Sequence, residues 1–437
     1  MTYQETTRKL LEFIDASPSC YHVIANLKKI YEDAGFIELR EETSWNITAG
    51  KNYYVVRNGS SIVAFKVPEK GWSGFQMAAS HSDFPSFKIK TNPEVDVEKH
   101  YTCLNVEKYG GMLCAPWFDR PLSIAGRILV EEEGRIVTKL LNIPRDLVMI
   151  PNVAIHMNRE VNNGYAYNPQ VDMIPLFGDE TAKGGFIKLI AGEAGVRMED
   201  ILDMDMFLYN RMPGTIWGAN EEYVSSRSLD DLQCVFGTVQ GFLKAENDTR
   251  ITMCCVFDNE EVGSATKQGA ESTMLSDVLH RIADSMGKSR EELLQAIANS
   301  FLLSADNGHA VHPNHPEKAD PTNRPYPNKG VVIKYNANQK YVTDGVSAGI
   351  FKTICKKAGV PVQTYVNRSD IAGGSTLGNL ANKHVSMNSV DIGLAQLAMH
   401  SPYETAGVKD TAYMIKACDT FFASAVCAEG DGVYRIL

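Results

Sequence analysis

The spacing of apolar residues predicts two helices at the start of the chain and then a change to strands. Residues 4–15 carry leucine and isoleucine at helical spacing, and a second helix is expected to start after Ser17-Pro18 and to run to Gly35. Residues 53–67 are two β-rich runs around an Asn-Gly dipeptide, which favours a type I′ hairpin turn. The apolar run at 74–80 reads as a buried strand that ends at His81.

From about residue 230 onward, apolar runs typical of strands alternate with amphipathic segments typical of helices. The expected helices cover 231–245, 267–300, 347–359 and 411–428, and the expected strands cover 251–257, 301–306, 329–336, 361–366 and 385–395. This alternation predicts an α/β fold with a mostly parallel sheet sandwiched by helices.

The middle of the chain follows a different pattern. Short β-like runs dominate residues 92–220, and a structureless segment of that length does not fit a compact domain. A chain of 437 residues is also long for a single core. We therefore expect a discontinuous α/β domain, 1–91 with 221–437, and an inserted, mainly β domain at 92–220.

Composition excludes several classes of partner. The apolar runs fall well short of the ~18 residues that a membrane span needs, and the first residues do not resemble a signal peptide. A net charge of −10 argues against nucleic acid as a partner. The nine cysteines include no CxxC pair and are expected to be free thiols, which predicts a cytoplasmic location and no thiolate zinc site.

Candidate chemistry gathers where the predicted strands end. Four residues follow predicted strands: His81, Glu260, Glu261 and Asp306. Two more open a predicted helix, Asp230 and Asp231, and one lies in a loop, His400. In open α/β sheets, ligands bind beyond the carboxyl ends of the strands. Two histidines and several carboxylates without a thiolate suit Zn²⁺, Mn²⁺ or Co²⁺, and a pair of such cations needs one bridging carboxylate.

The adjacent residues Glu260 and Glu261 are expected to have two different roles. On an extended segment, neighbouring side chains point in opposite directions, so one glutamate can coordinate a cation while the other acts as a general base. Asp83, two residues after His81, is placed to accept the second ring N–H of that histidine. Each residue also has a structural interpretation: a buried histidine, a solvated Glu-Glu pair, or a helix cap.

Several motifs together resemble the aspartyl aminopeptidase-type dizinc metallopeptidases. They are HSDFPSFKIK, RSLDDL, DNEEVGS, SADNGHAVHPNH, KGVVIKYN and LAMHSPYE, and the resemblance runs from about residue 20 to 425. It implies two divalent cations per subunit, most readily zinc, with cobalt or manganese as alternatives. The implied roles put His81 and Asp306 on one cation, Glu261 and His400 on the other, Asp230 as the bridge, Glu260 as the general base and Asp83 as the residue that orients His81.

The same resemblance implies a substrate and an assembly. His312 would contact the substrate or stabilise the oxyanion, Lys334 would lie near the first side chain of the substrate, and His156 would face a neighbouring subunit's site. The inserted domain would mediate contacts in a tetrahedral dodecamer that admits peptides. Plainer interpretations are an adventitious metal site for His312 and its neighbouring histidines, a solvated strand lysine for Lys334, and buried or interface packing for His156.

One loop departs from the family pattern. In residues 366–378, Asp370 and Gly374 match the aspartyl-specific members, whereas Ile371 and Ala372 do not. The resemblance implies a preference for N-terminal Asp or Glu, whereas this departure leaves a neutral, Leu- or Met-like preference open. A deacylase or carboxypeptidase with two metals is a competing function, as is a non-catalytic, shell-forming metal-binding protein. A serine acyl-enzyme is disfavoured because no Gly-x-Ser-x-Gly elbow occurs.

Overall fold

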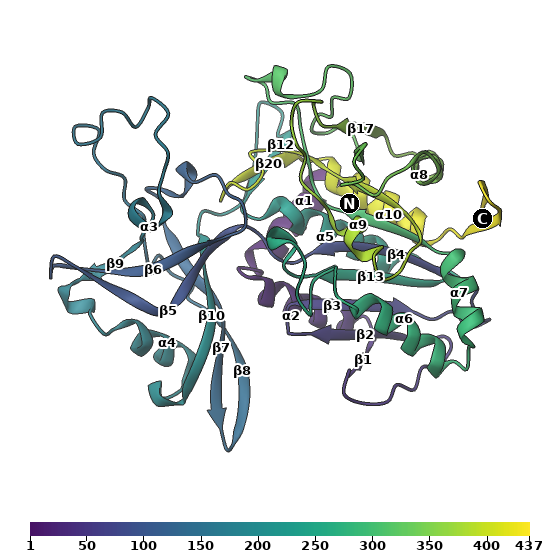
Figure 1. Ribbon diagram of the computed structural model, residues 1–437, viewed down its shortest axis with the longest axis horizontal. Coiled ribbons are helices and arrows are strands. Elements are labelled where there is room, and N and C mark those ends of the chain that lie inside the picture. Colours follow the sequence, from purple (N-terminus) through teal and green to yellow (C-terminus); the bar gives the residue numbers. More distant parts are fainter.

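The computed structural model describes residues 1–437 and consists of two lobes built on separate sheets (Figure 1). The larger lobe contains a nine-stranded sheet. Its strands, in spatial order, are β1 (Ile37–Leu39), β2 (Asn52–Arg57), β3 (Ser61–Lys66), β13 (Ile251–Phe257), β4 (Phe75–His81), β14 (Phe301–Ala305), β18 (Asn388–Gly393), β16 (Val331–Tyr335) and β17 (Val362–Val366). The four central strands β13, β4, β14 and β18 run parallel.

Helices cover both faces of this sheet, which confirms the expected fold class. One face packs against α1 (Tyr3–Asp15), α2 (Cys20–Asp33), α5 (Leu229–Lys244), α8 (Gly345–Ala358) and α10 (Asp410–Phe422). The other packs against α6 (Met274–Ser285), α7 (Arg290–Ala298) and α9 (Leu377–Ala381). Successive strand residues enter opposite cores, Ala78 one and Met77 the other. Burial on both faces explains why these strands are continuous apolar runs.

The hairpin predicted at 53–67 is confirmed, and two expected helices are shorter than predicted. Asn58 and Gly59 both have positive φ, 59° and 68°, as a type I′ turn requires. The segment expected to be helical at 267–300 instead begins with turns and then forms α6 and α7. The expected helix 411–428 ends at Phe422, because the following residues pair in a hairpin of β21 (Val426–Gly430) and β22 (Val433–Ile436).

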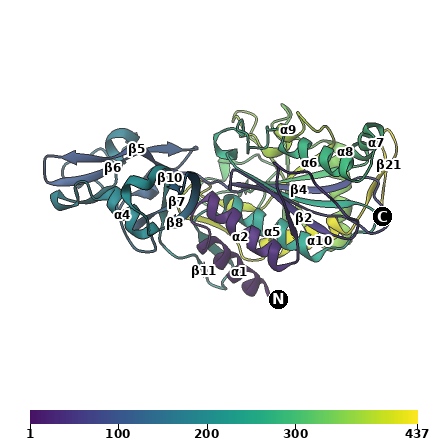
Figure 2. The ribbon, with the colours of Figure 1, turned by 90° about the horizontal axis from the view of Figure 1, so that it is seen from below.

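The second lobe, on one side of the molecule in Figure 2, is built on a six-stranded antiparallel sheet. Its strands, in spatial order, are β8 (Arg135–Asn142), β7 (Leu122–Glu132), β10 (Ile201–Asn210), β5 (Ser86–Val97), β6 (Tyr101–Tyr109) and β9 (Leu176–Asp179). Helices α3 (Pro169–Asp172) and α4 (Phe186–Ala194) accompany it, and 19 buried residues form its own core. The division of the chain at 92 and 220 stays a prediction.

A smaller five-stranded sheet joins distant parts of the chain beside the large one. Its strands, in spatial order, are β11 (Thr215–Trp217), β12 (Tyr223–Ser226), β20 (Glu404–Gly407), β19 (Ala395–Leu397) and β15 (Gly308–His309). It brings the segment after β14 next to the segment that contains His400. None of the helices combines the length and the apolar character that crossing a membrane requires.

Candidate metal centre

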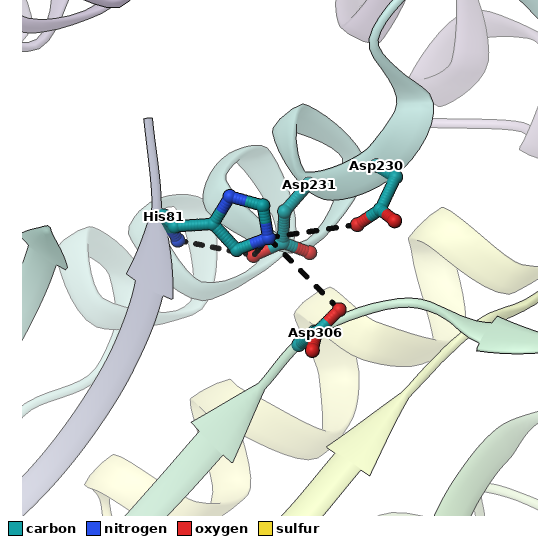
Figure 3. Close-up of side chains that lie close together, drawn as sticks. All are labelled: His81, Asp230, Asp231 and Asp306. Atoms are coloured by element: carbon teal, nitrogen blue, oxygen red, sulfur yellow. Dashed lines mark hydrogen bonds and ion pairs between the residues drawn. The ribbon is translucent and has the colours of Figure 1, made fainter. Parts of the chain in front are cut away.

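Three neighbouring strands deliver the candidate residues to one edge of the large sheet. His81 is the last residue of β4, Asp306 directly follows β14, and Glu260 and Glu261 follow β13. These strands are adjacent and parallel, so their carboxyl ends meet at the same edge. Figure 3 shows His81 facing Asp306 and the first turn of α5.

The first turn of α5 supplies two buried carboxylates. An oxygen of Asp230, Oδ1, lies 3.6 Å from Nε2 of His81, and the other, Oδ2, lies 3.4 Å from Nε2 of His400. Asp231 Oδ2 accepts a hydrogen bond from the main-chain N–H of His81 at 3.1 Å. Asp230 therefore stands between the two imidazoles, with one oxygen toward each.

Glu404 holds the two sides of this arrangement together. It is buried in β20, and its carboxylate accepts the main-chain N–H of Asp230 at 2.9 Å and that of His400 at 2.7 Å. Sequence reasoning assigned no role to Glu404, nor to Asp231, although both occur in motifs that it had singled out. The signals were the second aspartate of RSLDDL and the last residue of LAMHSPYE.

The two adjacent glutamates do not lie on an extended segment, so that part of the prediction is wrong. Glu260–Val262 form a single 3₁₀ turn that follows Asn259 in the left-handed region, φ 62°. The turn brings ligand atoms of Glu260, Glu261 and His81 within 4.8 Å of one another. Glu261 Oε2 also lies 3.3 Å from His400 Nε2, so Glu261 reaches both histidines.

Asp83 contacts His81 mainly through its backbone. Nδ1 of His81 lies 3.0 Å from the main-chain oxygen of Asp83 and 3.5 Å from its carboxylate Oδ1, so the expected carboxylate hydrogen bond is replaced by a carbonyl one. A carbonyl acceptor can fix the ring and its tautomer equally well. The carboxylate instead accepts the main-chain N–H groups of Glu260 and Glu261, at 3.1 and 3.2 Å.

The charges and unpaired atoms of the cluster fit divalent cations. Six carboxylates gather around two imidazoles: Asp83, Asp230, Asp231, Glu260, Glu261 and Asp306. Buried oxygens on Asp230, Asp231 and Glu261 have no hydrogen-bond partner. Buried carboxylates are costly unless they are paired or bind a metal, and these nitrogen and oxygen donors suit zinc and its neighbours.

Burial shapes the protonation of the cluster. It raises the pKa of Glu260 to about 8. His81 lowers this pKa, whereas the carboxylates of Asp306 and Asp83 raise it further. Burial also opposes the charge of Asp230, but the imidazoles of His400 and His81 outweigh it and lower the pKa of that carboxyl. Glu260 is thus a proton acceptor whose pKa can be tuned toward neutrality, a property typical of a general base.

A cavity of about 310 Å³ opens onto the cluster. Its lining includes Asp230, Glu260, Asp306, Lys334, Tyr341 and His400. Lys334 is only 3% exposed, and its Nζ lies 3.3 Å from Asp306 Oδ2, which excludes the interpretation as a solvated strand lysine. Burial works against its charge, but Asp306 together with Tyr341, Asp391 and Asp230 outweighs burial, and the pKa of Lys334 is raised.

Two of the residues implied by the resemblance lie away from the cluster within this chain. His312 is exposed and lines a neighbouring cavity, which shares His309, Tyr365 and Gly374 with the first. His156 is exposed in the segment between β8 and α3 of the second lobe. Neither contacts the clustered carboxylates.

A family model described as "Aminopeptidase I zinc metalloprotease (M18)" matches residues 13–422. The chain belongs to the M18 zinc metalloprotease family. It is 45% identical over 426 residues to the probable M18 family aminopeptidase 2 of Clostridium acetobutylicum, an alignment covering 96% of this chain and 98% of that one. The Pseudomonas aeruginosa protein of the same name is 37% identical over 429 residues, covering 96% and 99%.

Solved structures support this membership. An Ape4 chain in complex with Nbr1 superimposes with a TM-score of 0.93 at 35% identity, covering 96% of this chain and 86% of that one. A yeast mApe1 solved as a dodecamer gives 0.85 at 26% identity, covering 96% and 97%. The M18 chain is accordingly a metallo-aminopeptidase, a hydrolase of a zinc-dependent family.

Proposed function

We propose that this M18 aminopeptidase removes the N-terminal residue of peptides at a centre of two divalent cations. One cation would be held by His81 and Asp306 and the other by Glu261 and His400, and Asp230 would serve both sites. The observation that carries the proposal is the position of Asp230, whose two oxygens each face a different imidazole. Asp231, buried beside His81, orients that histidine through its main chain.

When bound, such cations would lower the pKa of a water molecule and would polarise the carbonyl of the scissile bond. Glu260 lines the cavity, takes a proton from the attacking water at its carboxylate and returns it to the leaving amine. Asp83 fixes the turn that carries Glu260, since its carboxylate accepts the main-chain N–H of that residue. His312, which lines the neighbouring cavity, would contact the substrate or stabilise the oxyanion.

We further propose that the first side chain of the substrate is acidic. Lys334 is the buried cation of the cavity, and it lies beside the metal cluster, where the first residue of a peptide would be held. The 366–378 loop forms part of the same wall through Gly374, Ser375 and Thr376. The competing preference, for Leu or Met, rests on the residues at 371 and 372 of that loop.

The chain is proposed to act as a homo-oligomer, in the form of the dodecamer seen for mApe1. Supporting this, the segment that contains His156 exposes apolar side chains, Val153, Ile155 and Met157, the last 82% exposed. The inserted domain at 92–220 would carry this contact and present His156 to a neighbouring site. A cytoplasmic location is proposed as well, on the basis of nine free thiols.

The deciding experiment is metal-dependent hydrolysis of a peptide library. Chelated protein is assayed with peptides that begin with Asp, Glu, Leu or Met, before and after Zn²⁺, Mn²⁺ or Co²⁺ is restored. Release of the first amino acid only with metal is expected, fastest for Asp or Glu. Each peptide is paired with an N-acetylated control, and cleavage of the control at an equal rate would indicate a carboxypeptidase or deacylase instead. Faster release of Leu or Met would overturn the acidic preference.

A further inference from the structure

The end of strand β6 reaches from the second lobe into the metal centre. The hydroxyl of Tyr109 donates a hydrogen bond to Asp83 Oδ2 at 2.7 Å and accepts one from the side-chain amide of Asn259, also at 2.7 Å. Tyr109 is the last residue of β6, whereas Asp83 and Asn259 follow strands of the large sheet. One hydroxyl thus joins the two lobes at the candidate site.

The residues after Tyr109 continue this contact. Gly110 has φ 76°, and a Cβ at that position would lie 3.1 Å from Cβ of Glu261, so the backbone passes directly over the glutamate. The main-chain N–H of Leu113 donates to the carbonyl of His400 at 3.1 Å. This short segment of the second lobe therefore touches Asp83, Glu261 and His400.

The carboxylate of Asp83 shows why the hydroxyl matters. It accepts three hydrogen bonds, two from the main chain of the Glu260-Glu261 turn and one from Tyr109. The main-chain donors belong to the turn that has to be positioned, so they cannot anchor the carboxylate by themselves. Tyr109 is the external donor, and its ring packs edge-on against Phe207 of β10 at 5.5 Å between centroids.

We propose that Tyr109 is a positioning residue of the metal centre. Its hydroxyl fixes the Asp83 carboxylate, which fixes the turn carrying Glu260 and Glu261, and the placement of the second lobe is thereby coupled to the geometry of the cations. The inference rests on the proposed two-cation function. It predicts that removing one oxygen atom, outside the set of cation ligands, changes how the cations are held.

The test compares Tyr109→Phe with Tyr101→Phe, a matched change on the same strand at a residue that is 53% exposed. Zinc affinity is measured by chelator competition, ligand geometry by the visible absorption of the Co²⁺-loaded protein, and turnover by kcat and KM on one peptide. Changes to groups that orient metal ligands typically cost about 10- to 100-fold in affinity or activity. For Tyr109→Phe we expect a loss of about tenfold in zinc affinity or kcat, a KM within about twofold of wild type, and an altered Co²⁺ spectrum. Tyr101→Phe should match the wild type in all three.

A second variant keeps the hydroxyl and removes its support. Phe207→Leu removes the ring against which Tyr109 packs, and we expect a smaller loss of zinc affinity or kcat than in Tyr109→Phe. If Tyr109→Phe fails to fold, Phe207→Leu tests the proposal in its place. An unchanged affinity, spectrum and kcat in Tyr109→Phe, with or without a lower melting temperature, would overturn the proposal. If the wild type cleaves no peptide, the proposed function fails, whereas zinc affinity and the Co²⁺ spectrum still test Tyr109.

Discussion

Replacing Asp230 by Asn tests the bridge more directly than any other single change. Among the three groups of side chains that could each hold a cation, Asp230 belongs to the group with Asp306 and to the group with His400 and Glu261. Asn keeps the size of the side chain and removes its charge. The binding of both cations should therefore be weakened together, whereas Asp306→Asn should weaken the binding of only one.

The magnitude follows from binding linkage. A cation present at 100 times its Kd stabilises the folded chain by about 2.7 kcal/mol, so two independent cations contribute about 5.5 kcal/mol. If Asp230→Asn lowers both affinities about a hundredfold, the same free zinc contributes only about 0.8 kcal/mol, since each site is then at its Kd. Asp306→Asn, which affects one site, should retain about 3.1 kcal/mol.

The assay is urea unfolding of chelated and zinc-buffered protein at one free zinc concentration. The quantity compared is the zinc-induced gain in the free energy of unfolding for wild type, Asp230→Asn and Asp306→Asn. Asp410→Asn is a control, because this buried carboxylate lies outside the three groups and should leave the gain unchanged. Equal gains in Asp230→Asn and Asp306→Asn would refute the bridging role.

Three further results are expected. Glu260→Gln should keep bound zinc and the fold but reduce kcat by ~10²–10⁴-fold; near wild-type turnover would exclude it as the base. Lys334→Met should lower kcat/KM for peptides beginning with Asp or Glu by at least ~10-fold more than for those beginning with Leu, from loss of a charge-assisted contact; equal losses would argue against the acidic pocket. Burial raises the pKa of Asp410 to about 7, above the ordinary 3.8, so stability present below 3.8 should be lost as pH rises toward 7. Asp410→Asn should flatten the urea-unfolding profile between those values, and an unchanged pH slope would contradict this.

Much of the fold could be predicted from local sequence patterns, because strand burial and turn conformation are set by residues close together in the chain. Strands such as Ile251–Phe257 are buried on both faces, and their sequences are accordingly uninterrupted apolar runs. The Asn58-Gly59 turn was predictable because few residues accept positive φ at two successive positions. The polar stretch before α6 does not form the predicted helix. Its one glycine, Gly269, is a weak signal in the sequence, but in the fold it lies against the backbone of Ser264, where a Cβ would come within 2.0 Å of the carbonyl oxygen.

The sequence by itself determined which residues could form the centre: apolar strands that stop at His81, Phe257 and Ala305 must leave ionisable side chains at one edge of a parallel sheet. Only the tertiary structure decided how these side chains are held. The hydrogen bond from the main-chain N–H of Asp230 to Glu404 joins residues 174 positions apart, and that from Tyr109 to Asp83 joins residues 26 positions apart. Such contacts leave no periodic trace in the chain, because each depends on where another element comes to lie.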